Sequence, residues 1–278
     1  MPRRFFRLAA LLLAWAALSS APVRAEVEVD LSLVIAVDVS FSMDPDEQNL
    51  QREGFIDAFR SPIVHDAIRR GALGRIAVAY TEWAGASDQR VLLPWTVIEG
   101  AEGANAFAEA LSRKPTRRAS RTSISGAIDH AVKMQEESGV VAVRRVIDVS
   151  GDGPNNQGRS VLAARADAIA RNITINGLPI MLKDAGYFDI QDLDFYYRDC
   201  VIGGQGAFMV PAKDKAQFRE AVKTKIIMEI AAAPVPGRAA EREGGSLVIL
   251  AQETRRANCF AGEQQWRDRM GTESSSPR

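Results

Sequence analysis

The sequence predicts an α/β domain with a doubly wound, mostly parallel central sheet, one antiparallel edge hairpin and helices on both faces. Apolar runs that fit strands alternate with amphipathic stretches that fit helices along most of the chain, as is typical of such sheets. The run from Leu31 to Val37 is aliphatic at every position except Ser32. Such a run indicates a strand buried on both faces, in the middle of a parallel sheet.

Residues 1–25 have the pattern of a secretory signal peptide. Arginines near the start precede an apolar run from Leu8 to Leu18, and Val23-Arg24-Ala25 supplies the small residues of a cleavage site. The apolar run is too short for a comfortable membrane span, and no cysteine lies near the cleavage point. We therefore expect export to the bacterial periplasm or the exterior, by either export pathway, with no stable membrane anchor after cleavage.

The charge balance argues against two classes of partner. The chain has 35 basic and 35 acidic side chains among 278 residues. The leader holds four arginines and no acidic residue, so its removal leaves a mildly acidic protein, still long enough for one large domain. Such a protein gives no support to binding of nucleic acid or of an anionic membrane. The oligomeric state stays open.

The first half of the mature chain is expected to continue with one long helix. Asp44 fits the N-cap, Pro45 the first helical position, and Glu47 completes a capping box. A strand then pairs with an antiparallel partner, because too few residues separate the two for a helix. The predicted elements are a helix over 45–70, strands over 75–83 and 90–95, and a short helix over 104–111.

The second half alternates between helix and strand and ends in a tail. Its predicted elements are helices from 122, over 160–171, within 189–198 and from an Asp214 cap, and strands over 145–150, 174–182 and 207–211. Pro179 places its strand towards a sheet edge. The domain spans 26–233, and the tail spans 234–278, with an apolar stretch at 246–251 that can dock and disorder from Gly271.

Three oxygen-bearing side chains follow the first strand. Asp38, Ser40 and Ser42 stand at alternate positions where the strand gives way to a turn, at the sheet edge where open α/β folds place ligands. Carboxylate and hydroxyl oxygens suit a hard cation. The stretch therefore predicts half of a cation site, although each of these residues could also simply form the turn.

This pattern resembles the metal-ion-dependent adhesion site of von Willebrand factor type A domains. In that family a threonine from a second loop and an aspartate from a third complete the site. Thr122, at a predicted helix start, and Asp152, after an apolar strand, match them in order. The resemblance covers residues 30–232 and extends, through residues 150–156 and 201–208, to a bacterial exported branch of unknown function. It implies the Rossmann-like fold of the family.

The resemblance also implies a function. Asp38, Ser40, Ser42, Thr122 and Asp152 would hold Mg²⁺, with Mn²⁺ or Ca²⁺ as alternatives, and one coordination position would take an acidic group of a partner protein. Two aspartates with neutral hydroxyls leave a cation electrophilic enough to attract an outside anion. The expected function is that of an exported, metal-dependent protein-binding module and not of an enzyme.

Two other functions stay open. A metal-dependent hydrolase or phosphatase could use Asp38 as nucleophile or a metal-activated water. The chain has no Gly-x-Ser-x-Gly elbow, no phosphate-binding loop ending in Lys-Ser or Lys-Thr, and no histidine-rich zinc pattern. A structural protein with a decayed metal site is the third possibility, because Ser120 and Arg121 stand where many family members carry two glycines.

Cys200 and Cys259 are the two cysteines of the chain, and both lie in the exported part. An oxidising compartment favours a disulfide between them, which would attach the tail to the domain. Two unrelated thiols are the alternative. His65 and His130 lie on predicted helices as surface or packing residues, and Asn155 and Asn156 are expected to form a turn.

Overall fold

The computed structural model describes residues 26–183, 190–231 and 256–273. Its sheet has five strands in the order β3-β2-β1-β4-β5. The central strand β1 (Val27–Asp38) pairs in parallel with β2 (Arg75–Trp83) and β4 (Val140–Gly151). At the edges, β5 (Ile173–Pro179) is parallel to β4 and β3 (Gln89–Glu99) is antiparallel to β2. The predicted fold class, with its antiparallel edge hairpin, is confirmed.

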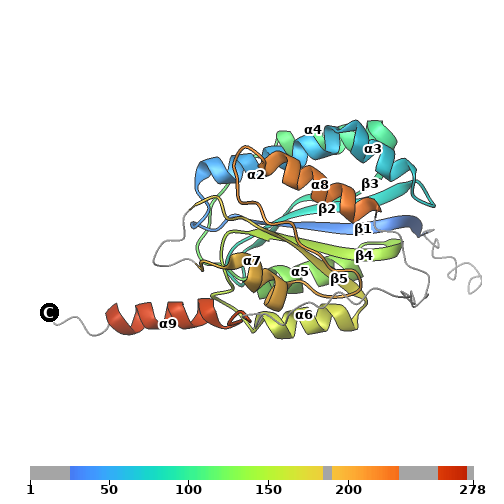
Figure 1. Cartoon of the computed structure of the whole chain (residues 1–278). Coiled ribbons are helices and arrows are strands. Elements are labelled where there is room, and N and C mark those ends of the chain that lie inside the picture. Colours follow the sequence, from blue (N-terminus) through green and yellow to red (C-terminus); the bar gives the residue numbers. More distant parts are fainter. Residues whose placement is uncertain (1–25, 184–189, 232–255, 274–278) are drawn as a thin grey trace, which may run out of the picture.

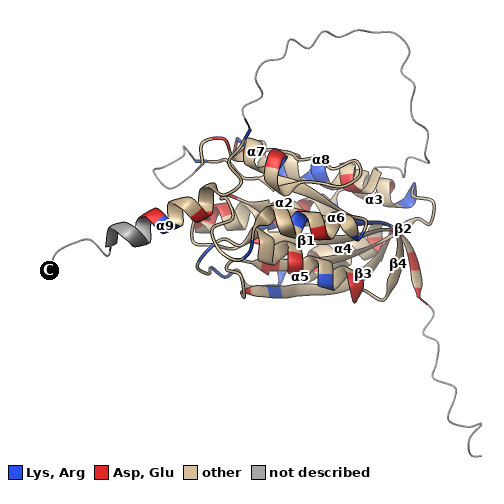
Figure 2. Ribbon diagram, turned by 90° about the horizontal axis from the view of Figure 1, so that it is seen from below, with Lys and Arg blue, Asp and Glu red and all other residues tan. Residues whose placement is uncertain are grey.

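Helices cover both faces of the sheet (Figure 1). One layer consists of α2 (Pro45–Arg60), α3 (Pro62–Arg69), α4 (Gly100–Ser112) and α8 (Phe218–Ala231). The other consists of α5 (Ile124–Glu136), α6 (Val161–Ala170) and α7 (Leu193–Tyr196), which continues into the π-helical turn η1 (Tyr197–Val201). Basic and acidic residues, blue and red on the ribbon of Figure 2, are interspersed along the helices, as the balanced composition leads one to expect.

Two hydrophobic clusters fill the space between the sheet and its helical layers. Successive side chains of a strand point to opposite faces, so β1 contributes to both clusters. Leu33 and Ile35 belong to the cluster that contains Phe55 of α2, and Val34 belongs to the cluster that contains Ile128 of α5. Each of these side chains is fully buried, which stabilises the fold by about 1.5–3 kcal/mol per residue. This double burial accounts for the continuous aliphatic run.

The long helix predicted over residues 45–70 is in fact two helices. Its capping box is as predicted, with Glu47 N–H donating to Asp44 Oδ1 at 2.8 Å and Asp44 N–H donating to Glu47 Oε2 at 3.0 Å. The prediction of one helix was wrong at Pro62, because the residue before a proline avoids helical backbone angles. Ser61 is extended, with ψ of 129°, and α3 starts afresh at Pro62.

The predicted strand over residues 207–211 is not a continuous strand. This segment runs beside β5 and meets it through isolated bridges, Gly177 with Met209 and Ile180 with Ala212. Prolines at 179 and 211 lack the N–H that a continuous ladder needs. β5 is the outermost strand, as predicted from Pro179. The last helix of the domain begins at Phe218 and not at an Asp214 cap, since Asp214 instead caps the preceding turn by accepting from Ala216 N–H.

The tail returns to the domain through the Cys200–Cys259 disulfide, whose Cα atoms lie 5.4 Å apart, so the favoured pairing of the cysteines is confirmed. A helix that the sequence did not predict, α9 (Ala261–Glu273), follows and includes residues 271–273, where disorder was expected. The signal peptide, the boundary at 234 and the apolar stretch 246–251 lie outside the described residues. Within the described ranges, no helix is long and apolar enough to cross a membrane.

Candidate metal site

The candidate ligands lie at the carboxyl ends of β1 and β4. Asp38 is the last residue of β1, and Asp152 directly follows β4. Because these strands are parallel neighbours, with Val37 opposite Ser150, both aspartates emerge at one edge of the sheet. This is the edge at which open α/β sheets bind ligands.

Ser40, Ser42 and Asp152 form a continuous chain of oxygen atoms. The hydroxyl oxygens of Ser40 and Ser42 lie 2.7 Å apart, and Ser42 Oγ donates to Asp152 Oδ1 at 2.6 Å. Asp38 joins the group because its Oδ1 accepts the Ser40 backbone N–H at 2.7 Å. The structure therefore brings four of the five predicted ligands into one hydrogen-bonded group from two distant loops.

The second carboxylate oxygen of Asp38 is an unsatisfied acceptor within this group. Asp38 is fully buried, and within the described part of the chain its Oδ2 has no hydrogen-bond partner. Leaving a buried polar atom unsatisfied costs about 1–3 kcal/mol. Gly151 keeps the space beside it open, since a Cβ at that position would lie 2.8 Å from Oδ2. An oxygen-binding cation would satisfy this atom.

The electrostatics of Asp38 and Asp152 would also favour a bound cation. Burial raises the pKa of Asp38 well above its usual range, the charge of Asp152 raises it further, and the hydrogen bond from the Ser40 backbone opposes both effects. Two carboxylates held this close repel each other. A divalent cation bound by both would remove that repulsion and favour the ionised form.

Thr122, the fifth predicted ligand, lies against the loop that carries Asp152. Its N–H donates to Asn156 Oδ1 at 3.0 Å, and its carbonyl accepts the Asn156 N–H at 2.8 Å. Thr122 is not the N-cap of α5, because this helix is capped by Ser123, whose Oγ accepts the Gly126 N–H at 3.1 Å. Helix capping therefore does not engage the Thr122 hydroxyl.

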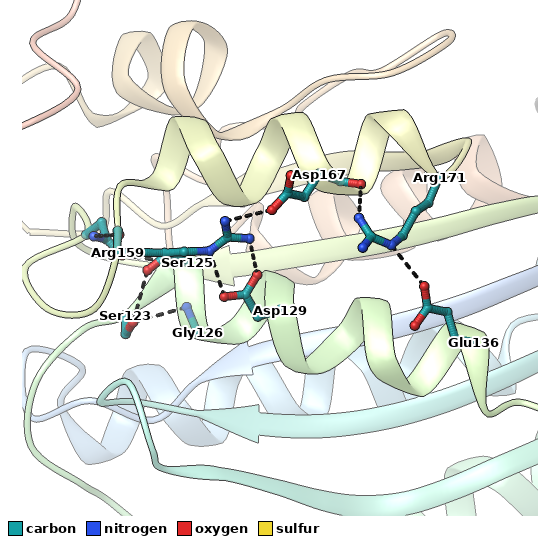
Figure 3. A network of polar contacts seen from close by, with 9 residues as sticks. Ser123, Ser125, Gly126, Asp129, Glu136, Arg159, Asp167 and Arg171 are labelled. Atoms are coloured by element: carbon teal, nitrogen blue, oxygen red, sulfur yellow. Dashed lines mark hydrogen bonds and ion pairs between the residues drawn. The ribbon is translucent and has the colours of Figure 1, made fainter.

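The loops that carry Thr122 and Asp152 are tied to each other and to the helices beneath. Ser123 Oγ donates to the Gln157 carbonyl at 2.8 Å. Arg159 pairs with Asp129 of α5 and Asp167 of α6, as Figure 3 shows beside the Ser123 cap. This polar network fixes the far end of the Asp152 loop.

Asn155 is a structural anchor that the sequence presented only as part of a turn. Its side chain is fully buried, its Oδ1 accepts the Ser125 N–H at 3.0 Å, and its own N–H donates to the Tyr196 hydroxyl at 3.2 Å. One residue thus connects the Asp152 loop to the start of α5 and to α7. An apolar–polar pattern gives no signal for such a role, because Asn is a common turn former in any case.

Lys183 lies against the site, although nothing in the sequence singled it out. Its Nζ donates to the Ser42 carbonyl at 2.7 Å, pairs with Glu47 at 2.5 Å and lies 3.8 Å from Asp152 Oδ2. Partial burial lowers the pKa of Lys183, but the hydrogen bond to Glu47 and the nearby carboxylates outweigh this effect and raise it. A positive charge is therefore already present beside Asp152.

The other side of the Ser40–Ser42 turn carries an exposed ring and a second cation. Phe41 is 58% exposed between the two serines, and Arg118 stacks on it with its guanidinium 5.3 Å from the ring centre. Arg118 Nη2 also donates to the Phe41 carbonyl at 2.6 Å. Arg118 and Lys183 thus bond to the carbonyl oxygens of two consecutive residues of the turn, Phe41 and Ser42.

The oxygen atoms of the candidate ligands are of the kinds that a hard cation prefers. In the ranges that the structure describes, no three His, Cys, Asp or Glu side chains come together as a metal site. Two carboxylates with hydroxyl oxygens instead match the preference of Mg²⁺ for oxygen, and differ from the nitrogen and sulfur ligands typical of structural zinc.

The sheet order and the two helical layers are those of a von Willebrand factor type A fold. The pilus adhesin SpaC from Lactobacillus rhamnosus GG shares it with a TM-score of 0.55 and 13% identity, over 73% of this chain and 31% of its own. Proximal thread matrix protein 1 from the mussel byssus shares it with a TM-score of 0.52 and 13% identity, over 74% and 48%.

A von Willebrand factor type A protein from Catenulispora acidiphila matches with a TM-score of 0.50 and 16% identity, over 73% of this chain and 43% of its own. This chain thus spans less than half the length of each of these proteins, and at such identities the similarity shows the fold alone. Residues 28–234 match a family described as Protein of unknown function (DUF1194), and the chain belongs to this family. No curated protein matches the chain.

Proposed function

We propose that the protein binds a divalent cation at the ends of β1 and β4 and uses it to capture an acidic group of a partner protein. The observation that carries the proposal is the hydrogen-bonded oxygen group of Asp38, Ser40, Ser42 and Asp152, with the unsatisfied Oδ2 of Asp38 inside it. Mg²⁺ is the expected ion, with Mn²⁺ or Ca²⁺ as alternatives. When bound, it would supply a Lewis-acidic centre for an outside carboxylate.

Each ligand would contribute differently. Asp38 and Asp152 provide the negative charge, and the hydroxyl oxygens of Ser40, Ser42 and Thr122 provide neutral acceptors with lone pairs to spare. Two carboxylates balance the charge of a divalent ion without surrounding it with anions, which leaves it able to attract one more. A third carboxylate among the ligands would compete with the partner for the ion.

The rim of the site fits a protein partner. Phe41 offers exposed apolar surface directly beside the candidate ligands, and Arg118 and Lys183 flank the turn with positive charge. An acidic side chain with an apolar neighbour would match this surface in charge and in polarity. A role in adhesion is also in keeping with the pilus adhesin among the proteins that share the fold.

We further propose that the mature protein, residues 26–278, acts in the periplasm or outside the cell. The leader pattern over residues 1–25 and the Cys200–Cys259 disulfide support this location, because disulfides persist in oxidising compartments.

Neither of the two histidines of the chain provides a general base for the enzyme alternative. His65 Nε2 bonds to the Phe59 carbonyl on the α2–α3 corner, and the charged neighbours of His130 on α5 are Lys133 and Glu137. Neither histidine is directed to the Asp38 group. Turnover of p-nitrophenyl phosphate that requires Mg²⁺ and disappears in Asp38→Asn would favour the hydrolase.

Partner capture tests the proposal directly. The immobilised mature protein should retain specific envelope proteins of its own source in Mg²⁺ and release them in EDTA. Asp38→Asn should retain none of them. Arg118→Glu should still bind the cation but retain less of the same partner at low salt, and this deficit should shrink as salt rises, because salt screens exposed charges. Retention that is equal in EDTA, or equal in Asp38→Asn, would reject metal-dependent adhesion.

A further inference from the structure

The segment that follows the disulfide contacts two of the loops that carry candidate ligands. This segment, residues 256–266, leads into and includes the first turns of α9, and Figures 1 and 2 show the rest of α9 extending away from the domain. Its contacts are with the residues beside Thr122 and with the loop after Asp152. Both loops belong to the proposed cation site.

The first contact joins Trp266 to Arg121. The guanidinium of Arg121 lies 3.4 Å from the centre of the Trp266 ring, which is close enough for a strong cation–π interaction. Arg121 has a left-handed backbone with φ of 75°, a conformation that a side chain with a Cβ rarely adopts without support. Trp266 thus supports Arg121 in this conformation, and with it the position of the adjacent Thr122.

The second contact joins Glu263 to Asn155. Asn155 Nδ2 donates to Glu263 Oε1 at 2.8 Å, and Gly262 packs so tightly on the same residue that a Cβ there would collide with the Asn155 carbonyl oxygen. Asn155 is the buried anchor of the Asp152 loop. The helix therefore presses directly on the residue that connects this loop to α5 and α7.

The segment is itself fastened at its start. Cys259 is bonded to Cys200 of η1, and the Ala257 N–H donates to Asp199 Oδ2 at 2.8 Å. η1 continues from α7, whose Tyr196 hydroxyl accepts the Asn155 N–H. A continuous series of contacts thus runs from the disulfide to both loops.

We propose that residues 256–266 clamp the Thr122 and Asp152 loops, and that Trp266 and Glu263 are positioning residues for the cation site. These residues do not touch the cation; they hold the loops that do. The effect on cation binding rests on the proposed function, whereas the clamping of the loops does not.

The loops should loosen when the contact is removed. Hydrogen–deuterium exchange of metal-free protein would be measured for amides 121–123 and 155–157 in wild type, Trp266→Ala and Gly262→Ala. We expect at least severalfold faster exchange in both variants, because the added Cβ of Gly262→Ala forces the helix off Asn155. Phe260→Ala is the matched control, since Phe260 lies in the same segment and is 47% exposed.

Cation affinity should fall with the loss of the contact. Calorimetric titration with Mn²⁺ alone should give a severalfold higher dissociation constant in Trp266→Ala. This is less than the about tenfold or greater effect of removing a direct partner of a metal ligand, because Trp266 acts through Arg121. Trp266→Phe keeps an aromatic face for Arg121 and should recover most of the affinity. Glu263→Gln keeps the acceptor for Asn155 and should bind nearly as wild type, whereas Glu263→Ala should not.

The two parts of the proposal can fail separately. Unchanged exchange of both loops in Trp266→Ala and Gly262→Ala would overturn the clamp. Faster exchange with unchanged Mn²⁺ affinity would overturn the positioning role. If wild type itself binds no Mn²⁺, the proposed function fails and the positioning role with it, while faster exchange in the variants would still support the clamp.

Discussion

Ser42 Oγ donates a hydrogen bond of 2.6 Å to Asp152 Oδ1 across a sequence separation of 110 residues. This bond joins the turn after β1 to the loop after β4, and so joins the two halves of the candidate site. If Ser42 is a cation ligand, removing its hydroxyl should weaken cation binding strongly and lower the stability of the metal-free fold only slightly.

In Ser42→Ala, Mn²⁺ affinity should fall by tenfold or more, because the change removes both a hydroxyl ligand and the bond that holds Asp152. The free energy of unfolding in EDTA should fall by only about 1 kcal/mol, the usual net value of one hydrogen bond. Calorimetric titration and urea unfolding measure the two quantities. Ser120→Ala, at an exposed serine of the neighbouring loop, is the control, and equal Mn²⁺ affinity in the two variants would count against Ser42 as a ligand.

Lys183→Met should strengthen cation binding. The Lys183 ammonium lies 3.8 Å from Asp152 Oδ2, where it repels an incoming cation and shares the carboxylate with it. Because Lys183 is partly exposed, the expected effect is modest: the Mn²⁺ dissociation constant should be about two- to fivefold lower than in wild type. Lys213→Met removes a charge from the wall of the cavity beside the site without touching Asp152, and should change the affinity less. Weaker binding in Lys183→Met would show that this lysine supports the site.

The buried ion cluster below α8 predicts a pH dependence of stability. Burial raises the pKa of Asp148 to about 6, against the opposing effect of Lys225, whose Nζ lies 2.9 Å from Asp148 Oδ1. Glu229 also pairs with Lys225 and adds negative charge. The folded state therefore binds more protons at Asp148 than the unfolded state between about pH 4 and pH 6, so the free energy of unfolding should decrease as pH rises through this window.

Asp148→Asn isolates that contribution. Urea unfolding at several pH values from about 4 to 7 should show a flatter dependence in Asp148→Asn, and each unit of pKa shift corresponds to about 1.4 kcal/mol. Measurements in EDTA exclude any effect of a cation on Asp38. The same slope in wild type and variant would assign the pH dependence to other groups.

Cys259→Ala should destabilise the domain, because the unfolded chain gains conformational entropy when the disulfide no longer restricts it. The disulfide closes a loop with a separation of 59 residues, which contributes about 4 kcal/mol on the chain-entropy model. Urea unfolding of the variant, compared with reduced and oxidised wild type, measures this loss. A variant as stable as oxidised wild type would mean that the tail is held by its other contacts alone.

Much of the fold could be predicted from local patterns. The aliphatic run at Leu31 to Val37 identified the central strand because both faces of β1 are buried, and the Asp44–Glu47 capping box located the start of α2. The errors have local physical causes that a prediction from the spacing of apolar residues does not take into account. Pro62 fits either the first turn of a helix or its interruption, and residues 207–212 pair with β5 only through isolated bridges.

The site was less predictable than the fold. The order of Asp38, Ser40, Ser42, Thr122 and Asp152 in the sequence could be matched to a known pattern, and the structure places these residues on adjoining loops. Lys183 and Trp266 could not be found in this way, because their relation to the site depends on how distant segments pack. Their roles come from contacts with residues far away in the sequence, which a local sequence motif does not reveal.

Thermal unfolding of the mature protein, residues 26–278, tests the central claim most directly. It would be measured in EDTA and then in millimolar Mg²⁺ or Mn²⁺, for wild type and for Asp38→Asn, which keeps the shape of the buried side chain. A cation that binds only the folded state should add about 2.7 kcal/mol at a hundredfold excess over its dissociation constant, or about 5–10 °C for a domain of this size. A rise in wild type that Asp38→Asn lacks is the predicted result, and no rise in wild type, or an equal rise in both, would contradict a cation site at Asp38.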